Sequence, residues 1–170
     1  LGIEGGGTRT TALLADARGR EIQRAIFGPG NVRLLDDRAL RRLLRQISKQ
    51  FESPDAISLG LAGARHAKDR ARVQAVVSKI WKATPCKVTH DLEIALTGSG
   101  LQETAVLVLS GTGSCCFGKT VNGRTAKMGG WGHILGDKGS GFEIGLRALK
   151  AVVFYFDRDG TWSQLGESLL

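Results

Sequence analysis

The sequence predicts an α/β fold in which a mixed sheet is built in the order βββαβαβα, followed by the beginning of a second, similar domain. Two glycine-containing turns join three short strands at the N-terminus, which indicates antiparallel hairpins. Strands and helices then alternate, and a second group of three strands starts at Ala105 around another glycine turn. This recurrence is typical of a duplicated architecture. A plain doubly wound sheet is excluded, because its strands would alternate with helices from the start.

The first domain is expected to cover residues 1–100. Its strands are predicted at Leu1–Glu4, Thr10–Asp16, Glu21–Phe27, Ile57–Leu61 and Cys86–Thr89. Helices are predicted from a cap at Asp36 or Asp37 to about Phe51, from Lys68 to Trp81, and from Leu92 to about Thr97. The first helix carries apolar residues at helical spacing, so one face is expected to be buried.

Residues 101–170 are expected to form the truncated beginning of a second domain. Strands are predicted at Ala105–Leu109, Cys115–Val121 and Arg124–Met128, and a long helix from about Ser140 to Phe156. The buried side of this helix is predicted to carry Phe142, Leu149, Val152, Val153 and Phe156. The chain lacks an initiating Met and stops at Leu169-Leu170 in what looks like the opening of a helix, so we expect a fragment.

Composition points to an ordinary globular protein, with 42% hydrophobic and 24% charged residues. No apolar run approaches the ~18–20 residues that span a bilayer, so no membrane partner is expected. The net charge is +8, but many of the basic residues lie on the polar side of the first helix, so a solvated face is expected rather than a nucleic-acid interface. The three cysteines form no CxxC pair, which favours a reducing, cytoplasmic compartment.

Two glycine turns are candidates for binding phosphate. Gly5-Gly6-Gly7-Thr8 follows a short apolar strand, and backbone amides in such a turn can converge on an anion, with Thr8 adding a hydroxyl and Arg9 a charge. A plain hairpin turn is the more common meaning of Gly-Gly taken alone. The second turn, Gly111-Thr112-Gly113-Ser114, lies in a matching strand-turn-strand setting. Together the two turns are predicted to face each other and hold one polyphosphate.

Asp91 lies where a strand passes into a helix. It could cap that helix, or it could act as the general base that takes a proton from a substrate hydroxyl. Ligands of α/β folds collect at this end of the strands, which supports the general base. The two interpretations therefore have equal weight.

The stretch Gly129–Ser140 is the most informative part of the sequence. Five glycines surround Trp131, His133 and Asp137 just before the long helix. An aromatic side chain beside a carboxylate is typical of a sugar site, because the sugar ring stacks on the aromatic ring while its hydroxyls donate hydrogen bonds to the carboxylate. The structural alternative is that Asp137 caps the helix and Trp131 fills the core. His133 is expected to be structural rather than catalytic.

Taken together, these motifs resemble a known family. GIEGGGTRTTALLAD, GPGN, GLAGA, THD, LSGTGS and GGWGHILGDKGSGFEIG are similar to segments of the N-acetylglucosamine kinases, which belong to the BadF/BadG/BcrA/BcrD ATPases within the actin/hexokinase/Hsp70 superfamily. The resemblance extends from Leu1 to about Lys150. It implies a ribonuclease H-like, actin-type fold with two domains and ATP in the cleft. It also implies transfer of the γ-phosphoryl group to the 6-hydroxyl of an N-acetylated amino sugar, foremost N-acetylglucosamine.

The resemblance also implies roles for single residues. ATP would be bound by Gly5, Gly6, Gly7, Thr8, Arg9, Gly111, Thr112, Gly113 and Ser114. Glu4 would help to hold Mg²⁺ through water, and Asp91 would be the catalytic base. The sugar would be contacted by Asn31, Asp91, Gly130, Trp131, Gly132 and Asp137. Ala62-Gly63-Ala64 replaces a more polar stretch of some relatives, so N-acetylmuramic acid, glucosamine and glucose stay open as substrates. A homodimer is a separate open expectation.

Two other functions remain as alternatives. One is an ATPase activator of 2-hydroxyacyl-CoA dehydratases, whose iron–sulfur cluster would need exposed cysteine thiolates. The other is a non-catalytic sugar sensor on the same fold, since fold does not fix function. Because family members are much longer, we expect these 170 residues alone to bind nucleotide weakly and to show little or no kinase activity.

Overall fold

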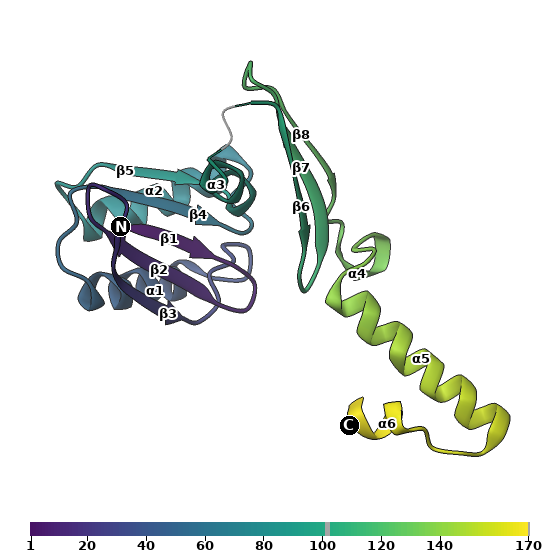
Figure 1. Cartoon of the computed structure of the whole chain (residues 1–170). Helices are drawn as coiled ribbons and strands as arrows, with labels where there is room; N and C mark the ends of the chain where they lie inside the picture. The colour runs from purple at the N-terminus through teal and green to yellow at the C-terminus, as the bar shows by residue number, and fades with distance from the viewer. Residues whose placement is uncertain (101–102, 170) are drawn as a thin grey trace. The chain divides into compact units, whose positions relative to one another are not determined.

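The computed structural model describes residues 1–100 and 103–169, and the chain divides into two compact units, residues 1–100 and 101–170 (Figure 1). Each unit combines strands and helices, which confirms the mixed α/β class. Two boundary residues of the expected second domain, Leu101 and Leu170, lie outside the described residues.

The first unit is built on a five-stranded mixed sheet with the strand order β3-β2-β1-β4-β5. Its strands are β1 (Gly2–Gly5), β2 (Thr10–Ala15), β3 (Glu21–Phe27), β4 (Ile57–Leu61) and β5 (Cys86–Thr89). The two predicted hairpins are confirmed, since β1 pairs with β2 and β2 with β3 in antiparallel fashion. In contrast, β1, β4 and β5 run parallel, so their carboxyl ends meet at one edge of the sheet.

Three helices cover this sheet. They are α1 (Asp37–Gln50), α2 (Ala67–Ile80) and α3 (Asp91–Gly98). Asp36 caps α1, because its side chain accepts a hydrogen bond from the Ala39 amide at 2.6 Å. Apolar residues of α1 and α2 form one cluster with the inward side chains of the sheet, and Leu40, Leu44 and Ile47 are completely buried. Burying one such side chain contributes about 1.5–3 kcal/mol, so this unit has a core of its own.

The second unit contains a three-stranded antiparallel sheet in the order β6-β7-β8. Its elements are β6 (Ala105–Ser110), β7 (Ser114–Lys119), β8 (Thr125–Gly129), α4 (Gly132–Leu135), α5 (Gly141–Asp159) and α6 (Gln164–Leu169). The single turn α4 was not expected from the sequence. Among the described residues, no helix combines the length and the apolar character that crossing a bilayer requires.

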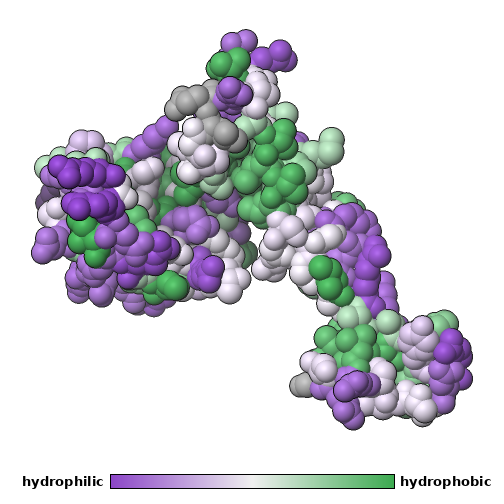
Figure 2. Space-filling model, viewed as in Figure 1, coloured by the Kyte–Doolittle hydropathy of each residue, from purple (hydrophilic) through white to green (hydrophobic). Residues whose placement is uncertain are grey.

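The predicted buried side of α5 is wrong. Only Val152 is buried; the other four residues are 44–57% exposed, namely Phe142, Leu149, Val153 and Phe156. Helical spacing of apolar residues predicts a face that seeks a partner, but in the described residues α5 packs mainly against the short α6. Apolar side chains therefore reach the surface of this unit, over the sheet and near α6 (Figure 2).

Candidate functional site

The carboxyl ends of the three parallel strands bring several predicted site residues to one edge of the first sheet. The turn Gly5–Thr8 begins at the last residue of β1, Ala62–Ala64 follows β4, and His90-Asp91 follows β5. This edge is where open α/β sheets bind their ligands. The sequence-based placement of these three segments is consistent with a binding site there.

The first glycine turn keeps two backbone amides available for an anion. The Gly6 N–H donates to the Arg9 carbonyl at 2.8 Å, and the Gly6 carbonyl accepts from Gly30 N–H at 2.9 Å. The amides of Gly7 and Thr8 donate to no described residue. The turn does join the β1–β2 hairpin, as the plain structural alternative requires, but it also has the unpaired N–H groups that a phosphate nest needs.

Asn31 is held beside the segment that follows β4. Its side-chain Oδ1 accepts a hydrogen bond from the Arg33 amide at 3.0 Å, and the next amide, Val32 N–H, donates to the Ala62 carbonyl at 2.9 Å. Gly63 has a φ of 82° and lies against the Asn31 side chain, so a side chain at this position would be strained and would also clash. Asn31 is therefore fixed at the same edge of the sheet as the first glycine turn.

Asp91 is the first residue of α3, and it does not cap the helix. The cap is His90, whose Nδ1 accepts a hydrogen bond from the Glu93 amide at 3.3 Å. The capping alternative for Asp91 is thus wrong, because the preceding side chain already fills that role. The Asp91 carboxylate is partly exposed and makes no hydrogen bond or ion pair with the described residues, so it is available to accept a proton.

Glu4 lines a cavity of about 460 Å³ on the face of the sheet opposite α1 and α2. Arg9, Thr11, Arg24 and Ser58 contribute to the same cavity. Among the described residues, no three His, Cys, Asp or Glu side chains form a closed metal cluster. A single exposed carboxylate nevertheless fits Mg²⁺, which keeps several waters and is usually held by one or two carboxylates together with substrate phosphates.

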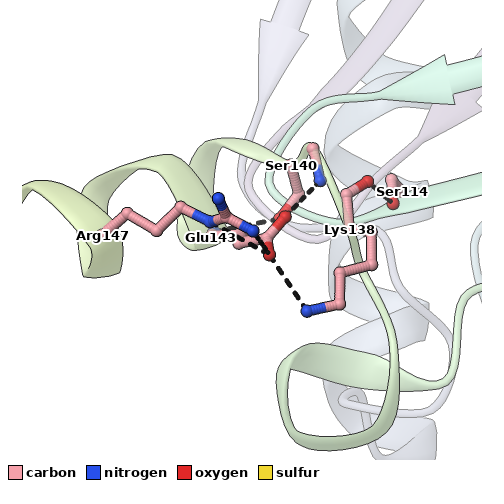
Figure 3. Close-up of polar contacts among 6 residues, drawn as sticks. Ser114, Lys138, Ser140, Glu143 and Arg147 are labelled. Carbon is pink, nitrogen blue, oxygen red and sulfur yellow. Dashed lines mark hydrogen bonds and ion pairs between the residues drawn. The ribbon is translucent and has the colours of Figure 1, made fainter.

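The second glycine turn is joined to the Gly129–Ser140 stretch by a set of hydrogen bonds. Ser114 Oγ donates to the Lys138 carbonyl at 2.7 Å (Figure 3). Ser110 Oγ donates to the Gly139 carbonyl at 2.8 Å, and Gly141 N–H donates to the Gly111 carbonyl at 2.8 Å. The amides of Thr112 and Gly113 make no hydrogen bond with the described residues. Two segments that the sequence separates are thus one structural element.

Asp137 belongs to this element and does not cap α5. The cap is Ser140, whose Oγ accepts from the Glu143 amide at 3.2 Å. Asp137 instead has a φ of 60°, and its Oδ1 accepts a hydrogen bond from the Ser114 amide at 3.2 Å. The capping alternative is therefore wrong, and the carboxylate faces the second glycine turn.

Glu143 fixes the residues that follow Asp137. Its carboxylate accepts from the Gly139 amide and pairs with Lys138 at 3.1 Å and with Arg147 at 2.9 Å (Figure 3). The hydrogen bond from the Gly139 amide, followed by those from the two basic side chains, lowers the pKa of Glu143 to about 2. Ser140 Oγ caps α5, and the Glu143 carboxylate holds the amide of Gly139, the residue before the cap.

Trp131 stands at the start of α4 with 75% of its surface exposed, so the alternative in which it fills the core is wrong. Three glycines around it have positive φ: Gly129 (77°), Gly130 (68°) and Gly132 (83°). Only glycine adopts such angles freely, and the run of them turns the chain so that the indole projects outward. His133 packs on Phe142 with ring centroids 4.7 Å apart, which fits its predicted structural role.

Three basic residues of the site were not expected from the sequence, one inside the Gly129–Ser140 stretch and two on α5. Lys138, Arg147 and Lys150 line a cavity of about 350 Å³ together with His133 and Asp137. The spacing of Glu143, Arg147 and Lys150 along one helix face was the signal that could have revealed them. Convergence of the two glycine turns on one polyphosphate stays a prediction, because the turns belong to different units.

Comparison with known proteins gives a family and several relatives. The model of the BadF/BadG/BcrA/BcrD ATPase family matches residues 1–162. The chain is 33% identical over 168 residues to the N-acetylmuramic acid/N-acetylglucosamine kinase of Clostridium acetobutylicum, covering 94% of the chain and 55% of that kinase. It is 28% identical over 187 residues to the N-acetyl-D-glucosamine kinase of Dictyostelium discoideum, covering 100% of the chain and 59% of that kinase.

Solved structures agree at the level of the fold. A Porphyromonas gingivalis protein assigned as an N-acetylglucosamine kinase superimposes with a TM-score of 0.75 at 21% identity, covering 98% of the chain and 59% of that protein. The chain spans little more than half the length of the curated relatives it matches.

Proposed function

Because the chain belongs to the BadF/BadG/BcrA/BcrD ATPase family, we propose that the whole protein is an ATP-dependent kinase that phosphorylates the 6-hydroxyl of an N-acetylated amino sugar, foremost N-acetylglucosamine. One observation carries this proposal. The second glycine turn, which has unpaired amides, is hydrogen-bonded to the Gly129–Ser140 stretch, which bears the exposed Trp131 and the Asp137 carboxylate. A sugar kinase requires a phosphate-binding site next to a sugar-binding site, and this element offers residues for both.

Phosphoryl transfer depends mostly on positioning and electrostatics, so each group has a defined task. The amides of Gly7, Thr8, Thr112 and Gly113 would hold the phosphates of ATP, supported by Arg9. The Ser114 hydroxyl, which donates to the Lys138 carbonyl, would keep the second glycine turn in place. Glu4 would help to hold Mg²⁺ through water, and the ion neutralises phosphate charge when bound. The second unit would be the beginning of the domain that closes over the nucleotide and excludes water.

Four residues would bind the sugar and activate it. Trp131 would stack against the apolar face of the ring, while Asn31 and Asp137 would accept hydrogen bonds from its hydroxyls. Asp91 would hold the attacking hydroxyl and take its proton. Its carboxylate has no partner among the described residues, which supports this role over a structural one.

The test is a coupled ADP-release assay on the whole protein with N-acetylglucosamine, N-acetylmuramic acid, glucosamine and glucose. We expect turnover with an N-acetylated sugar and a loss of about 10²–10⁴-fold in kcat for Asp91→Asn, with sugar binding retained. Asp157→Asn is the matched control, because this exposed carboxylate lies on α5 outside the proposed site. Sugar binding without any turnover by the unmodified protein would instead establish the sensor alternative.

A further inference from the structure

Asp137 has a strained backbone at the point where the Gly129–Ser140 stretch contacts the second glycine turn. Among the described residues it is the only non-glycine residue with a positive φ, at 60°. Asp tolerates this region better than most residues, but the conformation still costs free energy. Such strain persists where the surrounding structure imposes it, and it is concentrated at functional sites.

The strained backbone directs the Asp137 carboxylate onto the glycine turn. Oδ1 accepts the Ser114 amide at 3.2 Å, and a Cβ added to Gly113 would lie 2.9 Å from Oδ2. A side chain at position 113 would force the carboxylate to shift, so glycine favours this approach. The neighbouring amides of Thr112 and Gly113 make no hydrogen bond with the described residues. Of three consecutive amides in this turn, one is occupied by an anionic side chain and two are available.

A carboxylate and a phosphate oxygen cannot share this position. Both are anionic acceptors of the same N–H, and their charges repel strongly at contact distance in a partly desolvated site. A nucleotide phosphate that uses all three amides must displace Asp137. A sugar hydroxyl that donates to Asp137 would draw the carboxylate away from Ser114 and remove this obstacle.

We propose that Asp137 is a positioning residue that occupies the second phosphate loop until a sugar draws its carboxylate away, so that sugar and nucleotide bind cooperatively. This inference rests on the proposed function. The other contacts between the two segments involve main-chain carbonyls and serine hydroxyls, and Glu143 fixes Gly139 and Lys138. The segments can therefore stay joined while only the Asp137 side chain changes partner.

The inference is tested by titrating the magnesium complex of the non-hydrolysable analogue AMP-PNP into the whole protein, with and without saturating N-acetylglucosamine. For the unmodified protein we expect the sugar to tighten nucleotide binding at least about 5-fold, the lower end of usual allosteric coupling. For Asp137→Asn and Asp137→Gly we expect tighter nucleotide binding without sugar and less than about a 2-fold effect of sugar. Asp157→Asn should behave as the unmodified protein.

The two variants separate this role from a merely structural one. If Asp137 only held the two segments together, Asp137→Gly would loosen the turn and weaken nucleotide binding, and that result would overturn the inference. Unchanged coupling in Asp137→Asn would overturn it as well, while leaving the kinase proposal intact. If the unmodified protein bound neither sugar nor nucleotide, the proposed function would fail and the inference with it.

A second measurement needs no variant and does not depend on how well a variant folds. In the unmodified protein, sugar alone should shift the backbone amide resonance of Ser114, because the amide loses its carboxylate partner. The amide of Gly118, in the middle of β7, should stay unchanged. A Ser114 resonance that sugar leaves in place, while sugar binding itself is detected, would contradict the inference.

Discussion

The Glu93 amide donates a hydrogen bond to Nδ1 of His90, so a histidine caps the helix that begins with Asp91. The structural role therefore falls on His90, while the Asp91 carboxylate makes no hydrogen bond or ion pair with the described residues. This separation allows stability and catalysis at this junction to be tested separately.

Removing the cap should destabilise the first unit, whereas removing the Asp91 charge should not. We expect His90→Ala to lower the free energy of unfolding by about 0.5–2 kcal/mol, the usual cost of losing an N-cap hydrogen bond. Asp91→Asn should change the free energy of unfolding by no more than about 0.5 kcal/mol. Urea unfolding followed by circular dichroism measures both. Equal losses in the two variants would show that Asp91 has a structural role after all.

The same cap should make stability depend on pH. Burial, outweighing the attraction of Glu93 and Asp91, lowers the pKa of His90 below its usual 6.5. The unfolded chain therefore binds a proton more readily than the folded one, so the contribution of the neutral imidazole is complete above about pH 6.5 and is lost as the pH falls through the lowered folded pKa. We expect the urea midpoint to fall between pH 7 and pH 5. His90→Asn, a cap that does not titrate, should flatten this part of the profile.

Glycines 5 and 7 offer a matched pair in the first turn. A Cβ on Gly5 would lie 2.7 Å from Leu61 Cδ2 and 3.1 Å from Gly30 Cα, whereas a Cβ on Gly7 would meet nothing within 4 Å. We expect Gly5→Ala to cost about 1–3 kcal/mol of stability through overpacking. Gly7→Ala should keep the stability and weaken nucleotide binding, because the added methyl group crowds the unpaired amides. Thermal melts and nucleotide titrations of both variants would measure the contrast, and equal melting temperatures would refute it.

The Glu143 arrangement should be visible as a titration. The Gly139 amide, Arg147 and Lys138 lower the pKa of this carboxylate to about 2, so it should stay ionised well below the usual 4.5. A carbon-13 NMR titration of the side-chain carboxyl should therefore show a midpoint near 2. Replacing Arg147 and Lys138 by Ala should raise the midpoint towards 4.5. A wild-type midpoint near 4.5 would mean that the cluster does not persist in solution.

Sequence patterns were sufficient for elements whose signals are local. Glycine turns between short apolar strands located the first two hairpins, and the spacing of Leu40, Leu44 and Ile47 located α1 and its buried face. The roles of the two glycine turns and of Asp91 remain predictions. They are supported by backbone amides in the turns that donate no hydrogen bond to the described residues and by the Asp91 carboxylate, which accepts none.

Other features could not be predicted, because they depend on which of two neighbouring residues caps a helix or on contacts between residues far apart in the sequence. Asp91 and Asp137 both stood near helix starts, but His90 and Ser140 were better placed to accept the capping amide. The bond from Ser114 to Asp137 joins residues that are 23 positions apart, so no local pattern reveals it. The apolar spacing of α5 predicted a buried side that the structure does not show, because spacing carries no information on whether other residues cover that side.

The uneven distribution of buried apolar side chains has a calorimetric consequence. In the described residues, only Phe117 and Val152 of the second unit belong to the buried hydrophobic set, and all others lie in residues 1–100. The heat-capacity increment of unfolding scales with the apolar surface that becomes hydrated. The melting endotherm of the 170-residue chain should therefore belong almost entirely to its first hundred residues, and the enthalpy per residue averaged over the whole chain should fall below that of a fully packed protein.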